Sequence, residues 1–365
     1  MTGVLVHEWL SKRGGSENVL VELARIFPDA KVSTLWDDDP ARFAPGRVTE
    51  SWLARTPLRR RKAIALPFMP ETWRHLGFSD AEWVLASSHL FAHHARFSGP
   101  ARDARKYVYA HTPARYIWTP ELDERGKGRA TRVVSRPLQA LDRLRAQEAH
   151  SIAVNSAFVG RRVAEVWDRE STVIYPPVSV AAFEGDLSHL LTAEDEQVIR
   201  DLPAEFILGA SRFVPYKRLD IAISAGVSSG IPVVIAGDGP DEERLRALAA
   251  EHPNVVTFVI KPSTAVLNYL FHHALVYVFP PVEDFGIMPV EAMAAGTPVI
   301  ANLTGGAAES VVDGETGMLL DTFDPTSLRE AVNRSAEMSA SDCVARAWKF
   351  DVSVFDQHIR RWINE

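Results

Sequence analysis

The chain lacks the features that several protein classes require. Its 365 residues include one cysteine, Cys343, so neither an intrachain disulfide nor a metal site made of several cysteines can form. Only a four-residue apolar run precedes His7, which is shorter than the apolar core of a secretory signal peptide, and no apolar run is long enough to span a membrane. We therefore expect the protein to work in a reducing cytoplasm.

The chain also lacks a strong excess of positive or negative charge. Lys and Arg number 40 against 47 Asp and Glu, and the resulting net charge of −7 argues against general nucleic-acid binding. Hydrophobic residues make up 46% and charged residues 24%, as in ordinary globular proteins. A chain of this length is comfortable for two domains.

The order of apolar segments predicts two α/β halves. Strand-like and helix-like segments alternate up to residue 175, stop at Pro176 and Pro177, and restart at residue 206. This alternation is typical of mostly parallel sheets covered by helices on both faces. Residues 179–203 are polar and irregular, as in a hinge. The predicted strands are 3–6, 32–35, 83–86, 107–110, 152–154, 173–175, 206–208, 233–236, 255–259, 275–279 and 298–301.

One stretch, residues 279–301, combines a turn with two acids. An apolar strand ends at Pro280, a loop carries Glu283, and a helix begins after Gly286 and holds Glu291 in its second turn. Unpaired amides at a helix start suit a phosphate, and a carboxylate can accept two hydrogen bonds from a diol. On spacing alone, Glu283 is equally well a solvated loop acid and Glu291 a residue that complements the helix dipole.

The sequence of this stretch resembles a known family. The string EDFGIMPVE, followed by EAMAAGTPVIA, is similar to the signature of the retaining nucleotide-sugar glycosyltransferases of family 4, in their mannosyltransferase-like branch. The resemblance implies the GT-B fold, with two Rossmann-like doubly wound domains facing across a cleft. We expect an acceptor-side domain over 1–178, a linker over 179–203, a nucleotide-sugar-binding domain over 204–345, and a C-terminal helix in 346–365 that crosses back.

The resemblance extends to other motifs of the second half. The spacing G-x-S-R-x-x-x-x-K at 209–217 resembles the family's phosphate clamp, whereas Lys217 and Arg218 taken alone are more often solvated charges that start a helix. Lys261 follows Ile260, which stands where the family usually has a glycine beside the nucleotide base, so the base remains open. The implied donor-binding residues of this half are Arg212, Lys217, Lys261, Glu283, Phe285, Gly286, Ile287, Met288 and Glu291.

In the first half, two loops carry the likeness. Gly14 and Gly15 precede a helix, where a plain tight turn is an equal alternative, and the family has a Gly-Gly loop facing the donor diphosphate there. The string HTPARYIW follows a predicted strand. The resemblance implies that its His111 lines the donor-sugar site and supports the transition state, whereas an isolated histidine is more often structural. Its neighbours Arg115, Tyr116 and Trp118 would shape the sugar or acceptor pocket.

We predict no metal ion and no cofactor. The pairs His93-His94 and His272-His273 are adjacent, not four apart on one helix face, so zinc ligation is not indicated. Asp37 to Asp39 is interpreted as a solvated turn. Basic and bulky apolar residues alternate over 52–69, which suits an anionic membrane surface, with a solvated face over ordinary core as the alternative.

Together these features predict a metal-independent retaining glycosyltransferase, cytoplasmic and peripheral at the inner membrane face. The catalytic residues would be His111, Glu283, Arg212 and Lys217. By resemblance, the reaction moves mannose from GDP-mannose to a glycan or lipid-linked acceptor, by same-face attack in which the departing phosphate takes the acceptor's proton. The alternatives are a UDP-sugar donor, a nucleotide-sugar epimerase and a non-catalytic nucleotide-sugar-binding protein.

Overall fold

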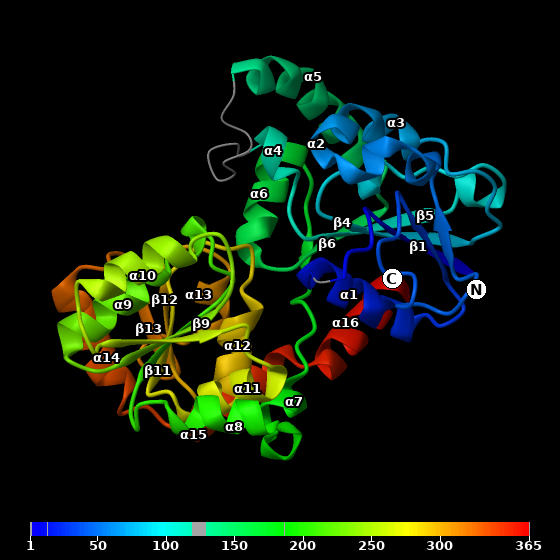
Figure 1. The fold of residues 1–365 in the computed structure, drawn as a ribbon. Coiled ribbons are helices and arrows are strands. Elements are labelled where there is room, and N and C mark those ends of the chain that lie inside the picture. Colours follow the sequence, from blue (N-terminus) through cyan, green and yellow to red (C-terminus); the bar gives the residue numbers. More distant parts are fainter. Residues whose placement is uncertain (1, 13, 119–128, 186, 365) are drawn as a thin grey trace. The chain divides into compact units, whose positions relative to one another are not determined.

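The computed structural model describes residues 2–12, 14–118, 129–185 and 187–364, and the chain in it divides into two compact units. Unit 1 comprises residues 1–177 together with 355–365, and unit 2 comprises residues 178–354. Each unit is built around its own sheet, and Figure 1 shows the helices that accompany each one.

Unit 1 contains a seven-stranded sheet in the order β3-β2-β1-β4-β5-β6-β7. Every neighbouring pair in it is parallel, so the carboxyl ends of all its strands lie at one edge. The strands are β1 (Gly3–His7), β2 (Lys31–Thr34), β3 (Val48–Glu50), β4 (Trp83–Ser88), β5 (Arg105–Ala110), β6 (Ser151–Val154) and β7 (Thr172–Val173).

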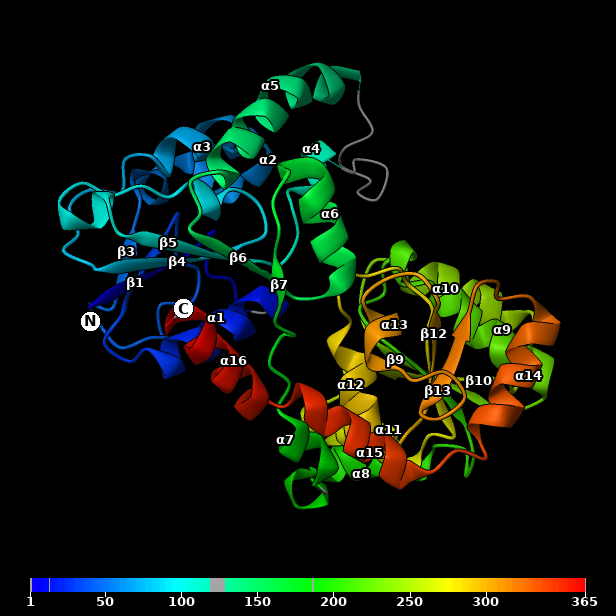
Figure 2. The ribbon, with the colours of Figure 1, turned by 180° about the vertical axis from the view of Figure 1, so that it is seen from behind.

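Helices cover both faces of this sheet (Figure 2). Helices α1 (Gly15–Ile26) and α16 (Val352–Asn364) pack on one face, around a core that includes Leu5, Leu85 and Tyr109. Helices α5 (Arg129–Ala146) and α6 (Ala157–Trp167) lie on the other face. Polar contacts also attach α16 to the sheet, since the Tyr107 hydroxyl donates to the Ile363 carbonyl at 3.0 Å. The last helix of the chain is therefore an integral part of unit 1.

Short helical turns fill the stretch between β3 and β4. They are the 3₁₀ turns η1 (Trp52–Arg55), η2 (Pro57–Arg60) and η3 (Leu66–Phe68) and the helices α2 (Lys62–Ala65) and α3 (Met69–Thr72). Leu53 and Met69 are buried in the core, so part of the apolar content of this stretch is ordinary packing. The turn interpreted as solvated is partly paired, because Arg59 contacts Asp38 at 2.8 Å.

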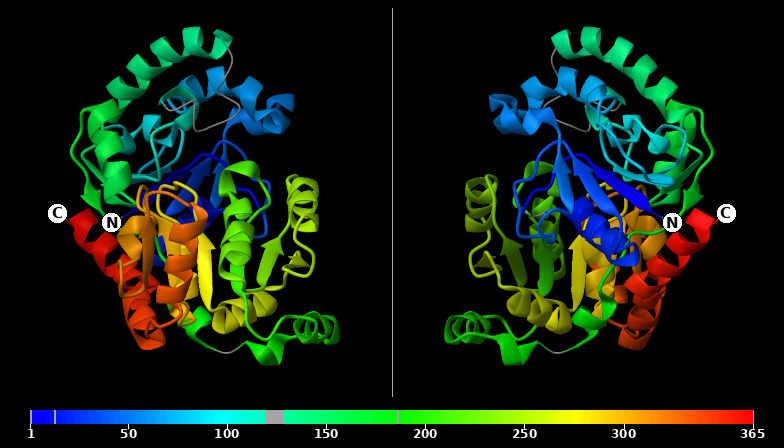
Figure 3. Two further views of the ribbon diagram at one scale, coloured as in Figure 1. Left: turned by 90° about the vertical axis from the view of Figure 1, so that its left-hand side faces the viewer. Right: turned by 90° about the vertical axis from the view of Figure 1, so that its right-hand side faces the viewer.

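Unit 2 contains a six-stranded parallel sheet in the order β10-β9-β8-β11-β12-β13. Its strands are β8 (Ile207–Ala210), β9 (Val233–Gly237), β10 (Val256–Ile260), β11 (Val276–Phe279), β12 (Val299–Asn302) and β13 (Gly317–Leu320). Helices α9 (Leu219–Ser229), α10 (Glu242–Ala250) and α14 (Pro325–Ser335) pack on one face (Figure 3). Further helices of this unit are α11 (Thr264–His273), α12 (Ile287–Ala294), α13 (Ala307–Ser310) and α15 (Ala340–Ala347).

The prediction of an irregular segment over 179–203 is wrong. It contains α7 (Val180–Glu184) and α8 (Ala193–Arg200). A capping box starts α8, because the Thr192 hydroxyl accepts from the Asp195 amide while the Asp195 carboxylate accepts from the Thr192 amide. The buried Asn268 of α11 holds the end of α7 by donating to the Phe183 and Gly185 carbonyls, each at 3.2 Å. No helix in the described residues is both long enough and apolar enough to cross a membrane.

Candidate functional site

The predicted phosphate clamp of unit 2 lies in two loops at the carboxyl ends of the neighbouring strands β8 and β11. After β8, the turn η9 (Pro215–Lys217) presents Lys217, and the loop after β11 presents Glu283. The structure brings these two together, because the Lys217 Nζ pairs with a Glu283 carboxylate oxygen. Arg212 is exposed, and its guanidinium donates to the Tyr216 hydroxyl at 3.0 Å. The two cations and the acid therefore share one edge of the sheet.

A glycine turn holds the Glu283 loop in place. Gly305 has φ 116°, a conformation that glycine adopts readily, and the Gly306 amide donates to the Glu283 carbonyl at 2.7 Å. A Cβ atom on Gly306 would clash with the backbone of Asp284 and Phe285. The two glycines thus let one loop lie directly against the other.

Gly286 precedes the first turn of α12 in a conformation that favours glycine. Its φ is 88°, and a Cβ atom would lie 3.0 Å from the Phe279 ring. The half-buried Ile287 and Met288 follow with the first amides of the helix, which have no partner within it. The Phe285 side chain is 3% exposed and its ring centroid lies 5.6 Å from that of Phe350. Phe285 therefore anchors the loop, and its backbone is the part nearest to the helix start.

Glu291 lies in the second turn of α12, as predicted from the sequence. Burial raises the pKa of its carboxyl from 4.5 to about 7. Since no hydrogen bond or ion pair to the Glu291 carboxyl is found in the described part of the chain, this group retains its full capacity to accept or donate. The protonation state of this carboxyl therefore changes near neutral pH.

Lys261 follows β10 and is exposed. Its φ is 51°, a left-handed conformation that is uncommon for a residue other than glycine. The Lys261 amide donates to the Gly237 carbonyl at 2.9 Å. This bond joins the turn after β10 to the turn after β9.

In unit 1, His111 follows β5 and is connected to a second histidine through Ser87. The His111 Nε2 lies 2.8 Å from the Ser87 hydroxyl, and the His7 Nδ1 lies 3.1 Å from the same hydroxyl. Burial, followed by the charges of His89 and His7, lowers the pKa of His111 to about 3. Burial also lowers the pKa of His7, to about 4. Both imidazoles are therefore neutral at neutral pH.

Glu8 and His89 complete this cluster and were missed from the sequence. One oxygen of the buried Glu8 accepts backbone amides of His89, Leu90 and Ala92 at 3.1, 2.8 and 3.0 Å. The other oxygen lies 3.2 Å from the His89 Nδ1. Burial alone would raise the pKa of Glu8, but His89, His7 and the amides lower it to about 2. The signal available in the sequence was that His7-Glu8 and Ser88-His89 each come shortly after a predicted strand, 3–6 and 83–86.

Gly14 and Gly15 lie at the start of α1, and the acid nearest to them belongs to the protein. Glu17 is buried and accepts from the Ser11 amide at 3.2 Å and from the Ser16 hydroxyl at 2.9 Å. A Cβ atom on Gly14 would clash with the Glu17 carboxylate. Packing against Glu17 is thus one reason for glycine at position 14.

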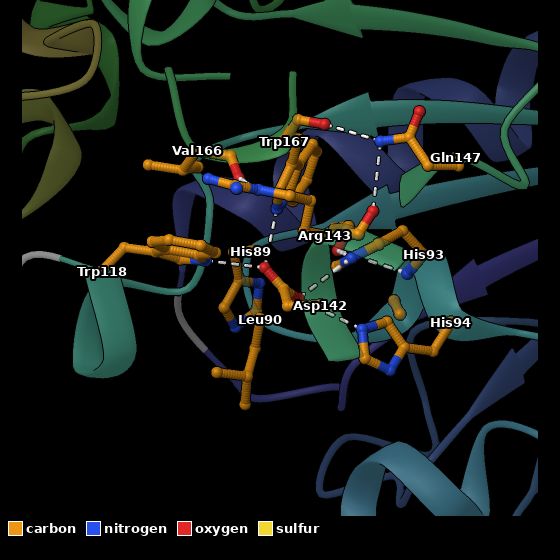
Figure 4. Close-up of polar contacts among 12 residues, drawn as sticks. His89, Leu90, His93, His94, Trp118, Asp142, Arg143, Gln147, Val166 and Trp167 are labelled. Atoms are coloured by element: carbon orange, nitrogen blue, oxygen red, sulfur yellow. Dashed lines mark hydrogen bonds and ion pairs between the residues drawn. The ribbon is translucent and has the colours of Figure 1, made fainter. Parts of the chain in front are cut away.

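The segment after His111 forms α4 (Arg115–Trp118), and its tryptophan is bonded inside the unit (Figure 4). The Trp118 and Trp167 indoles both donate to one oxygen of the buried Asp142 at 2.7 Å, while His93 and His94 lie 3.1 Å from the other.

Burial alone would raise the pKa of Asp142, but the charge of His93 and the bonds with both histidines hold it well below its usual range. Arg115 is half-buried, and Tyr116 packs against the apolar core of this face. Asp142, which the sequence gave no reason to select, is the residue that anchors Trp118.

The matching family model is that of the glycosyl transferases group 1, over residues 192–346. In this segment the chain is similar to the group 1 glycosyl transferases. Among curated relatives, a D-inositol 3-phosphate glycosyltransferase of Acidothermus cellulolyticus is 36% identical over 146 residues, which cover 35% of this chain and 32% of the relative. A GDP-mannose-dependent alpha-(1-6)-phosphatidylinositol monomannoside mannosyltransferase of Mycobacterium tuberculosis is 36% identical over 170 residues, covering 39% and 43% of the two chains.

An alpha-1,3/1,6-mannosyltransferase of Neurospora crassa is 30% identical over 216 residues, covering 48% of this chain and 46% of the relative. The matched stretches thus span between a third and a half of these curated relatives.

Solved structures match the fold of this chain along nearly its whole length. Anabaena HepE in complex with UDP-glucose has a TM-score of 0.71 at 21% identity, covering 99% of both chains. Sucrose-phosphate synthase from Thermosynechococcus elongatus has a TM-score of 0.71 at 16% identity, covering 100% of this chain and 98% of that one. The predicted fold class, α/β of the GT-B type, is confirmed.

Proposed function

We propose that the protein is a retaining glycosyltransferase that moves mannose from GDP-mannose to a glycan or lipid-linked acceptor. The observation that carries the proposal is the Lys217–Glu283 pair beside Arg212 and the start of α12, inside the segment that matches the family. Support for mannose comes from relatives named as mannosyltransferases, one of them GDP-mannose-dependent.

In unit 2, each group has a role that its chemistry suits. The Arg212 and Lys217 cations would hold the donor diphosphate and stabilise the charge that develops on it as the sugar leaves. The amides of Gly286, Ile287 and Met288 would add hydrogen bonds to the phosphate. Glu291 would accept the two ribose hydroxyls.

Glu283 would orient the donor sugar, since its carboxylate pairs with Lys217, the cation that would hold the diphosphate. In unit 1, the neutral His111 would accept a hydrogen bond from a sugar hydroxyl as positive charge develops at the anomeric carbon. The bond between that carbon and the phosphate oxygen breaks with its electron pair passing to the nucleoside diphosphate. The acceptor oxygen forms the new bond on the same face, and its proton goes to the departing phosphate.

A UDP-sugar is the second candidate donor. Anabaena HepE, a structure of the same fold, is described in complex with UDP-glucose. Ile260 stands where the family usually has a glycine beside the base, so the residues leave the base open.

The experiment is calorimetric binding of GDP, UDP and ADP, each with and without an attached hexose, to the full chain without added metal. Selective GDP binding that strengthens with mannose, followed by release of GDP in the presence of an acceptor, is the expected result. Preference for UDP would overturn the donor while keeping the reaction class. Binding of none of these nucleotides would overturn the proposed function.

We also propose that the stretch 52–69 contacts an anionic membrane. Trp52, Ile64 and Phe68 expose 50%, 51% and 46% of their surfaces, and four exposed cations accompany them, namely Arg55, Arg60, Arg61 and Lys62. Exposed aromatic and aliphatic side chains next to cations suit the interface of an anionic bilayer. Such contact would bring the enzyme to a lipid-linked acceptor.

A further inference from the structure

We propose that His7, Glu8 and His89 bind one divalent metal ion of the zinc type in unit 1. The three residues follow or end the paired strands β1 and β4, where His7 lies opposite Ser87 in the register. One ligand atom from each residue lies within 4.8 Å of the other two. Two imidazoles and one carboxylate form a ligand set that zinc accepts when a fourth position is left open.

The three residues present buried polar atoms that lack other partners. His7 Nε2, Glu8 Oε2 and His89 Nδ1 have no hydrogen-bond partner in the described part of the chain. The Glu8 Oε2 and the His89 Nδ1 are only 3.2 Å apart, yet they are not aligned as a hydrogen bond. Two ligands of one ion approach each other in this way, because each lone pair points to the ion and not to the other ligand. Leaving buried polar atoms unpaired is costly, so a bound ion would remove an unfavourable feature.

The surroundings fix the ligands in the form that binds a metal. The His7 Nδ1 lies 3.1 Å from the Ser87 carbonyl, which can only accept, so this nitrogen carries the proton and the neutral ring keeps a lone pair on Nε2. The first oxygen of Glu8 is held by three backbone amides, which leaves the second oxygen for the ion. Such outer hydrogen bonds orient ligands in known metal sites.

Access and charge also favour a cation. His7 and Glu8 are fully buried, whereas the His89 side chain is 25% exposed, so an ion and its water ligand could enter from this side. The titratable groups around the three ligands are His111 and the buried Glu17, whose charge acts on both His7 and His111. The Lys62 ammonium lies over the Trp9 ring, 4.0 Å from its centroid, and that ring packs edge-on against His89 at 5.0 Å.

A second group, made of His93, His94 and Asp142, serves as the comparison. Its ligand atoms are also close together, but both oxygens of Asp142 are already in use. The two tryptophan indoles occupy one oxygen, and the His94 Nε2 occupies the other at 3.1 Å. His93 Nε2 also lacks a hydrogen-bond partner. The two groups differ in the carboxylate, because both oxygens of Asp142 accept hydrogen bonds from the protein whereas Glu8 Oε2 accepts none, so we expect no ion at Asp142.

The test uses the full chain, stripped with a chelator and titrated with Co²⁺, whose visible absorption reports ligand geometry, and then with Zn²⁺ as the competitor. We expect one Co²⁺ per chain, displaced by Zn²⁺, and an affinity lowered by about 100-fold or more in H89N, H7N and E8Q. H75N, which changes an exposed histidine, and H94N should bind as the unchanged chain does. Circular dichroism checks that each variant is folded, and H89N is the decisive one because His89 is partly exposed.

Two outcomes would overturn the proposal. The first is an unchanged chain that binds neither ion. The second is binding that persists in H89N and H7N, or that is lost in H94N, which would move the ion to another site. Because the readout is ion binding, neither outcome depends on whether the chain transfers a sugar.

Discussion

The candidate sites of the two units differ in how much of their polar chemistry is already occupied by the protein. In unit 1, the buried side chains of His111 and His7 both contact the Ser87 hydroxyl. One oxygen of the buried Glu8 accepts hydrogen bonds from three backbone amides. In unit 2, Lys217 pairs with Glu283, whereas Arg212 and Lys261 are exposed cations. A site made of pre-oriented neutral rings suits positioning of an uncharged sugar, whereas exposed cations beside a helix start suit a highly charged phosphate.

The largest effects are expected when the charged side chains of the unit 2 site are removed. We expect K217A to lower transfer by about 10²–10³-fold, because a cation that stabilises developing charge is lost from the site. Nucleotide binding should weaken as well. E283A should abolish transfer while leaving nucleotide binding nearly intact. The two variants K217A and E283A therefore separate nucleotide binding from the transfer step. Calorimetry and nucleotide-release rates measure both, and full activity in E283A would refute the role of this acid.

The corresponding change in unit 1 is H111A. We expect transfer to fall by about 10²-fold with nucleotide affinity unchanged, since the imidazole would act on the sugar and not on the nucleotide. Burial keeps the pKa of His111 near 3. Protonation of this group should therefore not reduce the transfer rate of the unchanged protein until the pH falls towards 3. H75A is the matched control. A loss of nucleotide binding in H111A equal to that in K217A would erase the distinction between the units.

Gly286 tests whether the helix start needs its unusual backbone. G286A forces a side chain to adopt φ near 88° and brings a Cβ within 3.0 Å of the Phe279 ring. We expect a loss of about 1–3 kcal/mol in the free energy of unfolding. Chemical denaturation measures it, and G185A, at a glycine without positive φ, is the control. An unchanged unfolding midpoint in G286A would show that the turn relaxes without cost.

Glu291 predicts a pH effect confined to unit 2. Its carboxyl has a pKa of about 7 in the folded chain and 4.5 as the ordinary value, so the unfolded chain releases this proton at lower pH. The folded state is therefore favoured by the protonated acid at low pH, and stability falls as the pH rises from about 4.5 to about 7. E291Q should flatten this part of the profile, as measured by thermal unfolding between pH 4 and 8. A profile identical in E291Q and the unchanged chain would contradict the prediction.

The smallest effect is expected at the surface stretch 52–69. R60E/R61E should reduce sedimentation with phosphatidylserine-containing vesicles. The binding free energy should weaken by about 1 kcal/mol for each cation removed. Binding to neutral vesicles and nucleotide affinity should not change. Equal binding of the variant to anionic vesicles would remove the proposed membrane role.

Sequence reasoning found the local parts of the structure and missed the contacts between distant parts. The strands and the loop with Glu283 follow from apolar runs and prolines, which act on neighbouring residues. Glu8 was missed because its partners are amides about 80 positions away, and its burial is visible only in the sheet. The segment 179–203 was read as irregular because its polar composition outweighed the Thr192–Asp195 cap in that interpretation. The fold class is confirmed, while the roles of the site residues remain predictions.

Helix α16 affects the order in which the protein can be completed during synthesis. Phe355, Ile359 and Trp362 belong to the core of unit 1, although the whole of unit 2 is translated between them and residue 177. Until they emerge from the ribosome, the sheet face around Leu5 and Tyr109 has only α1 to cover it. Unit 1 is therefore the first to begin folding and the last to finish, and a nascent chain stalled before residue 355 would present an apolar surface to chaperones.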